Sequence, residues 1–509
     1  MKKEEIREVI ENNDWNIQSA YVAIFAADLV FRAYANSGKI YGMKYSPVCC
    51  YFSFRDLEAF YQIIKEESLR SLSGKVYEEF LEDNKSLDEK IEKHMNLSRE
   101  MDGVWGEYVD KCSGNVDNQC LLKYFQVLTE KSFLWWQIGV IGEDKAEVVN
   151  QKVIPAFQKR HNLSFEEAKD AIYDLSHPDE MTFFNQERKM FFEICVLISD
   201  TRSDTVEDIL SDEKVKEKIE KYLKRFFWVK NDFYRSHIMT PGEIVKDAIG
   251  EISKKGIENI KKDLEKIDDN FSEIKKRQKE LLDSLDLSEK DLKDIEFSKK
   301  VIHWFDFRKF GMMTHLHYIY QILEEIARVN KIDYHECCSY LTKELIDLMK
   351  NGVSVDENVI QKRRESSFIV YNEDENERIF GGSEGRDLFD LVMKKDSEEK
   401  TLKGTVASKG KSGDEKVIGK ARIVIRPQDA VFEEGEFLVT SMTRVEFVPL
   451  MRKAGAIITN EGGLACHAAI VSREMGLPAI IGTKNATQVL RDGDEVEMDL
   501  KSGEVRVVG

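Results

Sequence analysis

Glycine is distributed very unevenly along this chain of 509 residues. Residues 404–509 contain 13 of the 29 glycines and three of the seven prolines, in about a fifth of the length. A glycine inside a helix costs about 1 kcal/mol relative to alanine, whereas tight turns between short strands favour it. The distribution therefore predicts long helices in the first 400 residues and a small, turn-rich unit after them.

The first 400 residues are rich in Glu, Lys, Leu and Ile, which favour helices. Ser164 precedes Glu167 by three residues, which is the pattern of a capping box at a helix start. Thr240 and Pro241 give a second start signal, a cap followed by proline at the first helical position. We expect helices over 3–12, 15–37, 53–68, 73–101, 117–139, 144–160, 164–175, 184–200, 205–210, 212–226, 241–266, 268–284, 288–298, 300–329, 333–351 and 355–366.

The net charge of −18 belongs to the helical part of the chain. Residues 401–509 carry 15 basic and 15 acidic side chains, so the acidic excess lies before them. Lysine runs between residues 254 and 277 alternate with acids and indicate a solvated helix face, which could be an antiparallel arm. Because a phosphate-binding face needs clustered positive charge, we expect no nucleic acid partner.

The sequence contains no membrane-spanning stretch, no targeting peptide and no cysteine motif for metal binding, and these absences narrow the class of protein. No stretch approaches the roughly 20 apolar residues of a membrane span, and the acidic start is unlike a signal or transit peptide. We therefore expect a cytoplasmic protein with no membrane partner. The eight cysteines are scattered without a CxxC motif, which favours reduced, buried thiols and no metal site; they are Cys49, Cys50, Cys112, Cys120, Cys195, Cys337, Cys338 and Cys466.

Short β-rich segments alternate with two helical pieces after residue 404. We expect strands over 417–425, 436–442, 454–460, 478–483, 494–500 and 504–509, and helices over 447–453 and 467–475. The fold class is then multidomain, with a large, mostly α-helical N-terminal region followed by a small α/β domain. The expected domains are a helical region of unknown role (1–200), a second helical domain (201–380), a hinge or linker (381–403) and the α/β domain (404–509).

The sequence NEGGLACHAAIVSREMGLPAIIG (460–482) joins a strand to a helix through two glycines, and His467 begins the helix. Free N–H groups at a helix start bind anions, and the positive helix end keeps an imidazole neutral and nucleophilic. These features suit a histidine that accepts and passes on a phosphoryl group. A lone histidine at a helix start is, however, more often a cap or a hydrogen-bonded surface group, and spacing alone does not separate these alternatives.

Residues 459–483 closely resemble the phosphohistidine signature TxxGGxxxHAAIxARExGxPAVVG of the phosphoenolpyruvate-utilising enzymes, and residues 419–459 resemble the preceding half of their mobile domain. The resemblance implies a swivelling domain in which His467 carries the phosphoryl group. It implies supporting positions at Thr443, Thr459, Gly462, Gly463, Cys466 and Arg473. Residues 443–446 depart from the family's TxPxxxP pattern, although Thr443 and Pro449 are kept.

Residues 222–234, 324–349 and 362–371 resemble, more loosely, the helical domain of rifampicin-phosphotransferase-like and phosphoenolpyruvate-synthase-like proteins. That resemblance implies an acceptor site in the helical domain. No ATP-grasp or barrel domain is recognisable, so we expect no directly bound cofactor, with ATP and Mg²⁺ used through a separate ATP-grasp subunit.

Two further functions stay open beside a dikinase-type phosphotransferase component. One is a phosphohistidine relay or regulatory module that acts on a partner protein, and the other is a scaffold without turnover. His303, His315 and His317 fall close together in sequence and include a candidate general base or metal ligand, although neighbours two apart face different sides of a helix. Trp135 and Trp136 lie in an apolar run and are expected in the core.

Overall fold

The computed structural model describes the chain except for residues 1–2, 14, 21–22, 44–47, 55–58, 113–115, 141–147, 179, 204, 232–234, 373–376, 397–400, 411–414, 426, 428–429, 444–446, 462–466, 484 and 509. The chain forms two compact units. The helical unit comprises Phe25–Pro47 and Glu67–Ser354, and the mixed unit comprises Met1–Ile24, Val48–Glu66 and Val355–Gly509. Among the described residues, no helix combines the length and the apolar character that crossing a membrane requires.

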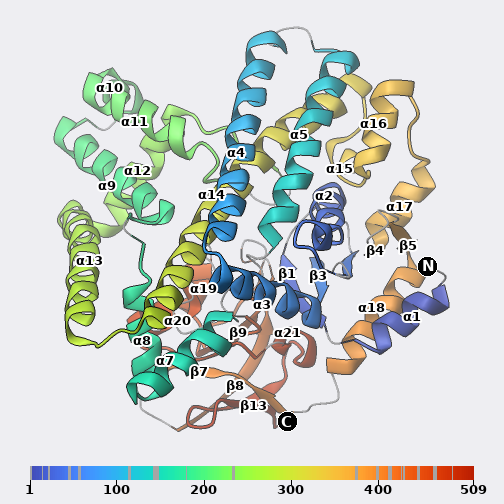
Figure 1. Cartoon of the computed structure of the whole chain (residues 1–509). Coiled ribbons are helices and arrows are strands. Elements are labelled where there is room, and N and C mark those ends of the chain that lie inside the picture. Colours follow the sequence, from blue (N-terminus) through green and yellow to red (C-terminus); the bar gives the residue numbers. More distant parts are fainter. Residues whose placement is uncertain are drawn as a thin grey trace. The chain divides into compact units, whose positions relative to one another are not determined.

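The helical unit is built from helices (Figure 1). They are α2 (Ile24–Tyr34), a 3-10 turn (Ser37–Lys39), α3 (Glu66–Glu82), α4 (Lys85–Cys112), α5 (Asn118–Gly139), a π-helical turn (Val149–Val153), α7 (Ile154–His161), α8 (Phe165–Leu175), α9 (Phe183–Thr201), α10 (Val206–Ser211), α11 (Glu213–Phe226), α12 (Pro241–Lys255), α13 (Ile257–Ser284), α14 (Glu289–Asn330), α15 (Tyr334–Cys337) and α16 (Thr342–Asn351). The two predicted helix starts are confirmed, since Ser164 and Thr240 each complete a capping box.

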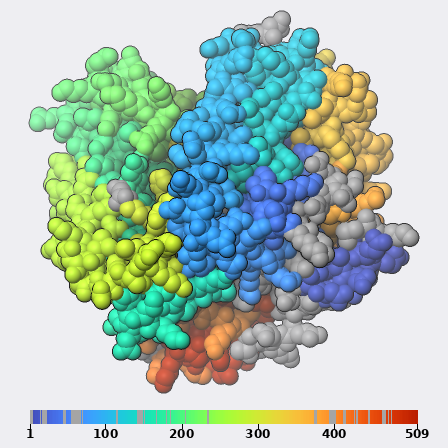
Figure 2. Space-filling view, in the orientation of Figure 1, coloured from blue at the N-terminus to red at the C-terminus, as the bar shows by residue number. Residues whose placement is uncertain are grey.

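Two cores hold this unit together. The long helices α4, α5 and α14 pack on one another, with Trp135 and Phe125 of α5 fully buried. A second core joins α9, α11, α12 and α13 around residues such as Ile194 and Ile219. Because α13 packs on α9 through Ile260, the charged segment expected as an arm is one wall of this core. Figure 2 shows a notch at the upper edge between the green surface of the second core and the blue surface of α4.

The mixed unit contains a five-stranded antiparallel sheet in the order β1-β3-β2-β4-β5. The strands are β1 (Trp15–Ala20), β2 (Cys49–Phe54), β3 (Ala59–Lys65), β4 (Ser366–Tyr371) and β5 (Arg378–Gly381). Helices α1 (Lys3–Glu11) and α18 (Ser383–Asp396) cover one face, where Ile10, Phe52 and Phe389 share a core. Helix α17 (Glu357–Glu365) leads into β4.

This sheet corrects several predictions. The helix expected over 15–37 is the strand β1 followed by α2, and the helix expected over 53–68 falls on β2 and β3. The cause is long-range pairing, because β2 lies between β3 and β4, and β4 is more than 300 residues further along the chain. The hinge expected over 381–403 contains α18, which packs on β4 and β5 instead of serving as an open linker.

An eight-stranded sheet forms the rest of the mixed unit, in the order β6-β13-β12-β8-β9-β10-β11-β7. Its elements are β6 (Thr401–Lys403), β7 (Thr405–Lys409), β8 (Lys416–Ile423), β9 (Phe437–Thr440), α19 (Val448–Met451), β10 (Ala456–Thr459), α20 (His467–Met475), β11 (Pro478–Ile481), α21 (Ala486–Val489), β12 (Glu495–Asp499) and β13 (Glu504–Val507). Alternate residues of β10 serve two cores: Ile458 packs toward α21 and β12, and Ile457 packs toward α19 and α20.

The predicted fold class is confirmed, with a mostly helical region followed by a small C-terminal α/β domain. The boundaries expected at residues 200 and 380 differ from the two compact units, because the mixed unit takes its strands from both ends of the chain. The prediction of reduced cysteines is wrong for one pair, since Cys112 and Cys120 form a disulfide. Antiparallel packing of α4 and α5 brings these two residues together at the ends of their helices.

Candidate functional site

Parallel strands bring several polar residues to one edge of the eight-stranded sheet. Strands β8, β9, β10 and β11 run parallel to one another, so their carboxyl ends lie at the same edge. In α/β sheets, ligands bind outside the carboxyl ends of such strands. The segment that follows β10 at this edge leads into α20, whose first residue is His467.

Buried side chains and amides fix the path of the chain as it leaves β10. The Thr459 hydroxyl is buried and donates to the Glu461 carbonyl at 2.6 Å. The Thr459 carbonyl in turn accepts from the amide and the hydroxyl of Thr483, at 3.0 and 2.9 Å. Thr459 therefore fixes the path of the chain from β10 to Glu461 through its hydrogen bonds to the backbone, and its support of a phosphoryl group stays a prediction.

Asn460 ties the same edge to α21, and sequence analysis missed this contact. Its side chain donates to the Thr487 hydroxyl at 2.7 Å and accepts from the Thr487 amide at 2.9 Å. Its own amide donates to the Thr440 carbonyl at 3.0 Å. A polar residue placed directly after a buried apolar strand was the available signal, but its partner lies 27 residues away.

Small buried residues of α20 pack against the sheet. Ala468, Ala469 and Ser472 are at most 2% exposed and let the helix lie close to β11 and β7. Arg473 is exposed, and its Nε donates to the Ala407 carbonyl of β7 at 2.9 Å. Arg473 lies six positions after the first residue of α20, which is about 9 Å along the axis. Its contact anchors α20, and a contact with a phosphoryl group stays a prediction.

The remaining predicted positions divide into two groups. Thr443 is buried, and it lies in the chain segment that connects β9 to α19. Gly462, Gly463 and Cys466 lie outside the described residues. The part of the site that the structure describes is therefore the strand edge with Thr459, the start of α20, and the contacts that hold both.

The three candidate histidines of α14 do not come together. His303 is exposed, whereas His315 contacts Trp135 and His317 lies beside Asn231 and Phe227. Burial lowers the pKa of His315 to about 3 and that of His317 to about 4. Trp135 and Trp136 are buried in the core, as predicted. Among the described residues, no three metal-ligating side chains gather into a possible ion site.

Comparison with known proteins agrees with the geometry. Residues 432–503 match the family model described as PEP-utilising enzyme, mobile domain. A probable phosphoenolpyruvate synthase of Staphylothermus marinus is 43% identical over 151 residues, which is 29% of this chain and 17% of that protein. A rifampicin phosphotransferase of Bacillus cereus is 27% identical over 255 residues, which is 48% of this chain and 28% of that protein.

The second similarity is too long for the C-terminal domain alone and reaches into the preceding region. A phosphoenolpyruvate synthase of Aquifex aeolicus is 43% identical over 119 residues. The matched segments span between 14% and 28% of the length of these three relatives. The similarity predicted from the glycine–histidine sequence is thereby confirmed at the level of the domain family.

Proposed function

We propose that this chain is a phosphotransferase component in which His467 carries the phosphoryl group. The proposal starts from the C-terminal segment, which matches the mobile domain of PEP-utilising enzymes. The observation that carries the proposal is the position of His467 as the first residue of α20, the helix that follows the parallel strand β10 in the chain. A helix start there offers free N–H groups and a positive end to a phosphoryl group.

The donor in this proposal is ATP bound by a separate ATP-grasp subunit with Mg²⁺. The chain's own residues would position the imidazole, and the start of α20 would stabilise the charge of the attached group. The acceptor would bind in the helical region, which shares the longer similarity with a rifampicin phosphotransferase.

The test is phosphorylation of the purified chain with ATP labelled at the β-phosphate, with and without a candidate ATP-grasp protein. A parallel reaction uses labelled phosphoenolpyruvate as donor. We expect an acid-labile label on the wild type and none on His467→Ala, because only an imidazole at this position forms the P–N bond. His303→Ala is the matched control, since His303 is an exposed histidine on another helix. Its label should equal that of the wild type.

Equal labelling of wild type and His467→Ala would refute the carrier role, provided that thermal unfolding shows both proteins folded. The fate of the label separates the remaining functions. Transfer from the labelled chain to a small molecule supports the phosphotransferase. Transfer only to another protein would instead support the relay module.

A further inference from the structure

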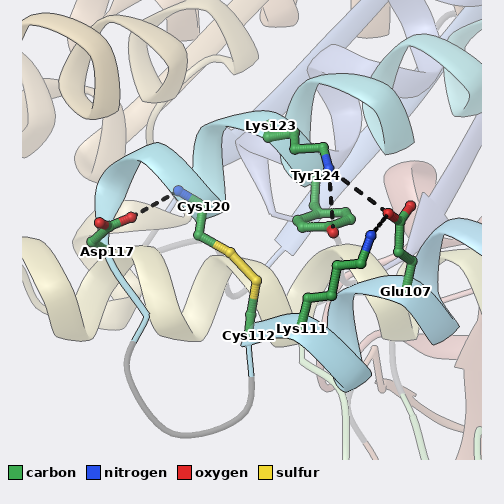
Figure 3. Close-up of a disulfide and its surroundings, with 7 residues drawn as sticks. All are labelled: Glu107, Lys111, Cys112, Asp117, Cys120, Lys123 and Tyr124. Atoms are coloured by element: carbon green, nitrogen blue, oxygen red, sulfur yellow. Dashed lines mark hydrogen bonds and ion pairs between the residues drawn. A yellow bond between two sulfur atoms is a disulfide. The ribbon is translucent and has the colours of Figure 1, made fainter.

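The ends of α4 and α5 are joined by a disulfide that the sequence did not lead us to expect. Cys112 is the last residue of α4, and Cys120 is the third residue of α5. Figure 3 shows the two side chains bridging the gap between the helices. These helix ends lie at the upper edge of the view in Figures 1 and 2.

Of the two paired cysteines, Cys120 differs from the other described cysteines in its surroundings, whereas Cys112 is buried as they are. Cys49, Cys50, Cys195, Cys337 and Cys338 are buried thiols. Burial raises the pKa of the Cys195 thiol to about 12 and that of Cys50 still further, which keeps both in the unreactive thiol form. Cys120, by contrast, is partly exposed at the surface end of a helix hairpin.

The position of Cys120 favours a thiolate once the bond is reduced. It lies in the first turn of the 22-residue helix α5, where the positive helix end stabilises a negative sulfur. Asp117 caps this turn by accepting the Cys120 amide at 2.8 Å. Lys111 and Lys123 both pair with Glu107, to one side of the disulfide (Figure 3).

The hairpin end is continuous with an aromatic cluster that joins three helices. Tyr108 of α4 meets Tyr124 of α5 with ring centroids 5.5 Å apart. Trp105 stacks on Tyr108 at 5.2 Å and on Tyr318 of α14 at 4.9 Å. A covalent link one turn beyond this cluster restrains the separation of α4 and α5 and therefore stabilises the ring contacts.

We propose that Cys112 and Cys120 form a reversible thiol–disulfide exchange site that clamps the α4–α5 hairpin. A small-molecule disulfide is the oxidant: the Cys120 thiolate attacks it, forms a mixed disulfide and releases one thiolate. The Cys112 thiolate then attacks the Cys120 sulfur and expels the second thiolate. In sum, one small disulfide and two protein thiols give the protein disulfide and two small thiols, and an excess of a small thiol reverses both steps. This site is independent of the function proposed for His467.

The redox state can be read directly from one tryptic peptide. Cleavage after Lys111 and Lys123 releases CSGNVDNQCLLK, which contains both cysteines. The native protein is equilibrated with set ratios of reduced and oxidised glutathione, alkylated in denaturant, digested and weighed by mass spectrometry. The alkylated peptide from the reduced protein is heavier than the disulfide-bonded peptide by the mass of two alkyl groups, each of which replaces a thiol hydrogen. We expect a reversible transition that is the same from the oxidised and the reduced side.

Two outcomes of this titration would overturn the proposal. One is a peptide that is fully alkylated at every ratio, since the pair would then not form in the folded protein. The other is a disulfide that resists small thiols until the chain is unfolded, since the bond would then be a fixed crosslink. Both outcomes are measured on the wild type, so they do not depend on any variant that has to fold.

Hydrogen exchange tests the clamp itself. Reduction of the wild type should speed amide exchange at the end of α4 and the start of α5 by on the order of tenfold or more. Amide exchange in the double variant Cys112→Ser/Cys120→Ser should be as fast as in the reduced wild type, and added reductant should not change it. Cys195→Ala, which changes a cysteine in the second core, should keep the response. Identical exchange in oxidised and reduced wild type would show that the bond restrains nothing.

Discussion

At the scale of single residues, the most unusual feature is a pair of buried histidines around Trp135. His94 stacks on Trp135 with ring centroids 4.2 Å apart, and His315 meets the same ring at 4.9 Å. The Nδ1 atom of His94 accepts from the Trp304 indole at 3.0 Å, which places the proton of the neutral ring on Nε2. Both nitrogens of His315 have no hydrogen-bond partner among the described residues. Burial lowers the pKa of both histidines, and Arg308 lowers that of His94 further.

These histidines should make the helical unit sensitive to acid. Their folded pKa values lie below the usual 6.5, so the folded state binds fewer protons than the unfolded state. The contribution of His315 to stability is therefore fully present above about pH 6.5 and falls by about 1.4 kcal/mol per pH unit as the pH drops toward 4. The lowered pKa of His94 acts in the same direction. Urea unfolding followed by tryptophan fluorescence at a series of pH values measures this slope. His315→Leu should reduce the slope, while the exposed-site control His303→Ala should not; equal slopes in all three proteins would contradict the assignment.

A second prediction concerns two buried carboxylates. Arg160 of α7 donates to Asp291 and to Asp294 of α14, both at 2.7 Å, and the two aspartates are at most 1% exposed. Arg160→Met would leave both charges without this partner and should destabilise the helical unit by about 3–5 kcal/mol.

Arg328→Met is the matched control for that change. Arg328 also makes a two-nitrogen contact with a carboxylate, that of Glu325, but its side chain is 61% exposed. Its loss should cost less than about 1 kcal/mol. Five of the six tryptophans lie in the helical unit, so the fluorescence midpoint in urea compares the two variants directly. A similar cost for both would mean that burial does not set the strength of the Arg160 contacts.

At the scale of elements, local sequence predicted helices better than strands. The helix starts at Ser164 and Thr240 depend on residues within one turn, so sequence alone placed them. The segments CCYFSF and AFYQIIK are rich in aromatic and β-branched residues, which is a strand signal, but they lie among helix-forming neighbours. Their strand conformation depends on pairing with each other and, for β2, with the distant β4.

The docking of α18 on the five-stranded sheet leads to a third prediction. A Cβ atom added to Gly385 would lie 2.4 Å from the Phe380 carbonyl oxygen and 3.0 Å from the Phe368 amide nitrogen. Backbone atoms cannot move aside easily, so Gly385→Ala should weaken the packing of α18 by about 1–3 kcal/mol.

Gly106 provides the matched substitution in a helix. It lies inside α4, and an added Cβ would meet nothing within 4 Å. Gly106→Ala should stabilise its helix by about 0.5–1 kcal/mol, because alanine loses less backbone entropy on folding. Hydrogen exchange of the α18 and α4 peptides measures both changes. Faster exchange in α4, or unchanged exchange in α18, would show that the two glycines were assigned the wrong roles.

At the scale of the whole molecule, the mixed unit is assembled from three separate stretches of chain. Its eight-stranded sheet, however, is contained within residues 401–509 and has two cores of its own. The five-stranded sheet needs both ends of the chain, because its buried strand β4 pairs with β2 near the N-terminus.

This difference predicts how fragments of the chain behave. A fragment of residues 401–509 should fold cooperatively, since every strand of its sheet keeps its partners. A fragment of residues 355–509 should contain the same folded domain, with residues 366–371 exchanging freely because β2 is missing. Circular dichroism and hydrogen exchange measure these properties. Protection of residues 366–371 in the longer fragment would show that β4 does not need β2.

The sequence by itself determined the C-terminal domain and its histidine. Strand β10, the glycine segment and α20 are neighbours in the chain, so 25 consecutive letters were enough to place His467 at a helix start. Only the tertiary structure decided the five-stranded sheet, the Cys112–Cys120 bond and the burial of His94 beside His315. Each of these depends on contacts between elements that are brought together by packing, and a pattern confined to neighbouring residues does not contain that information.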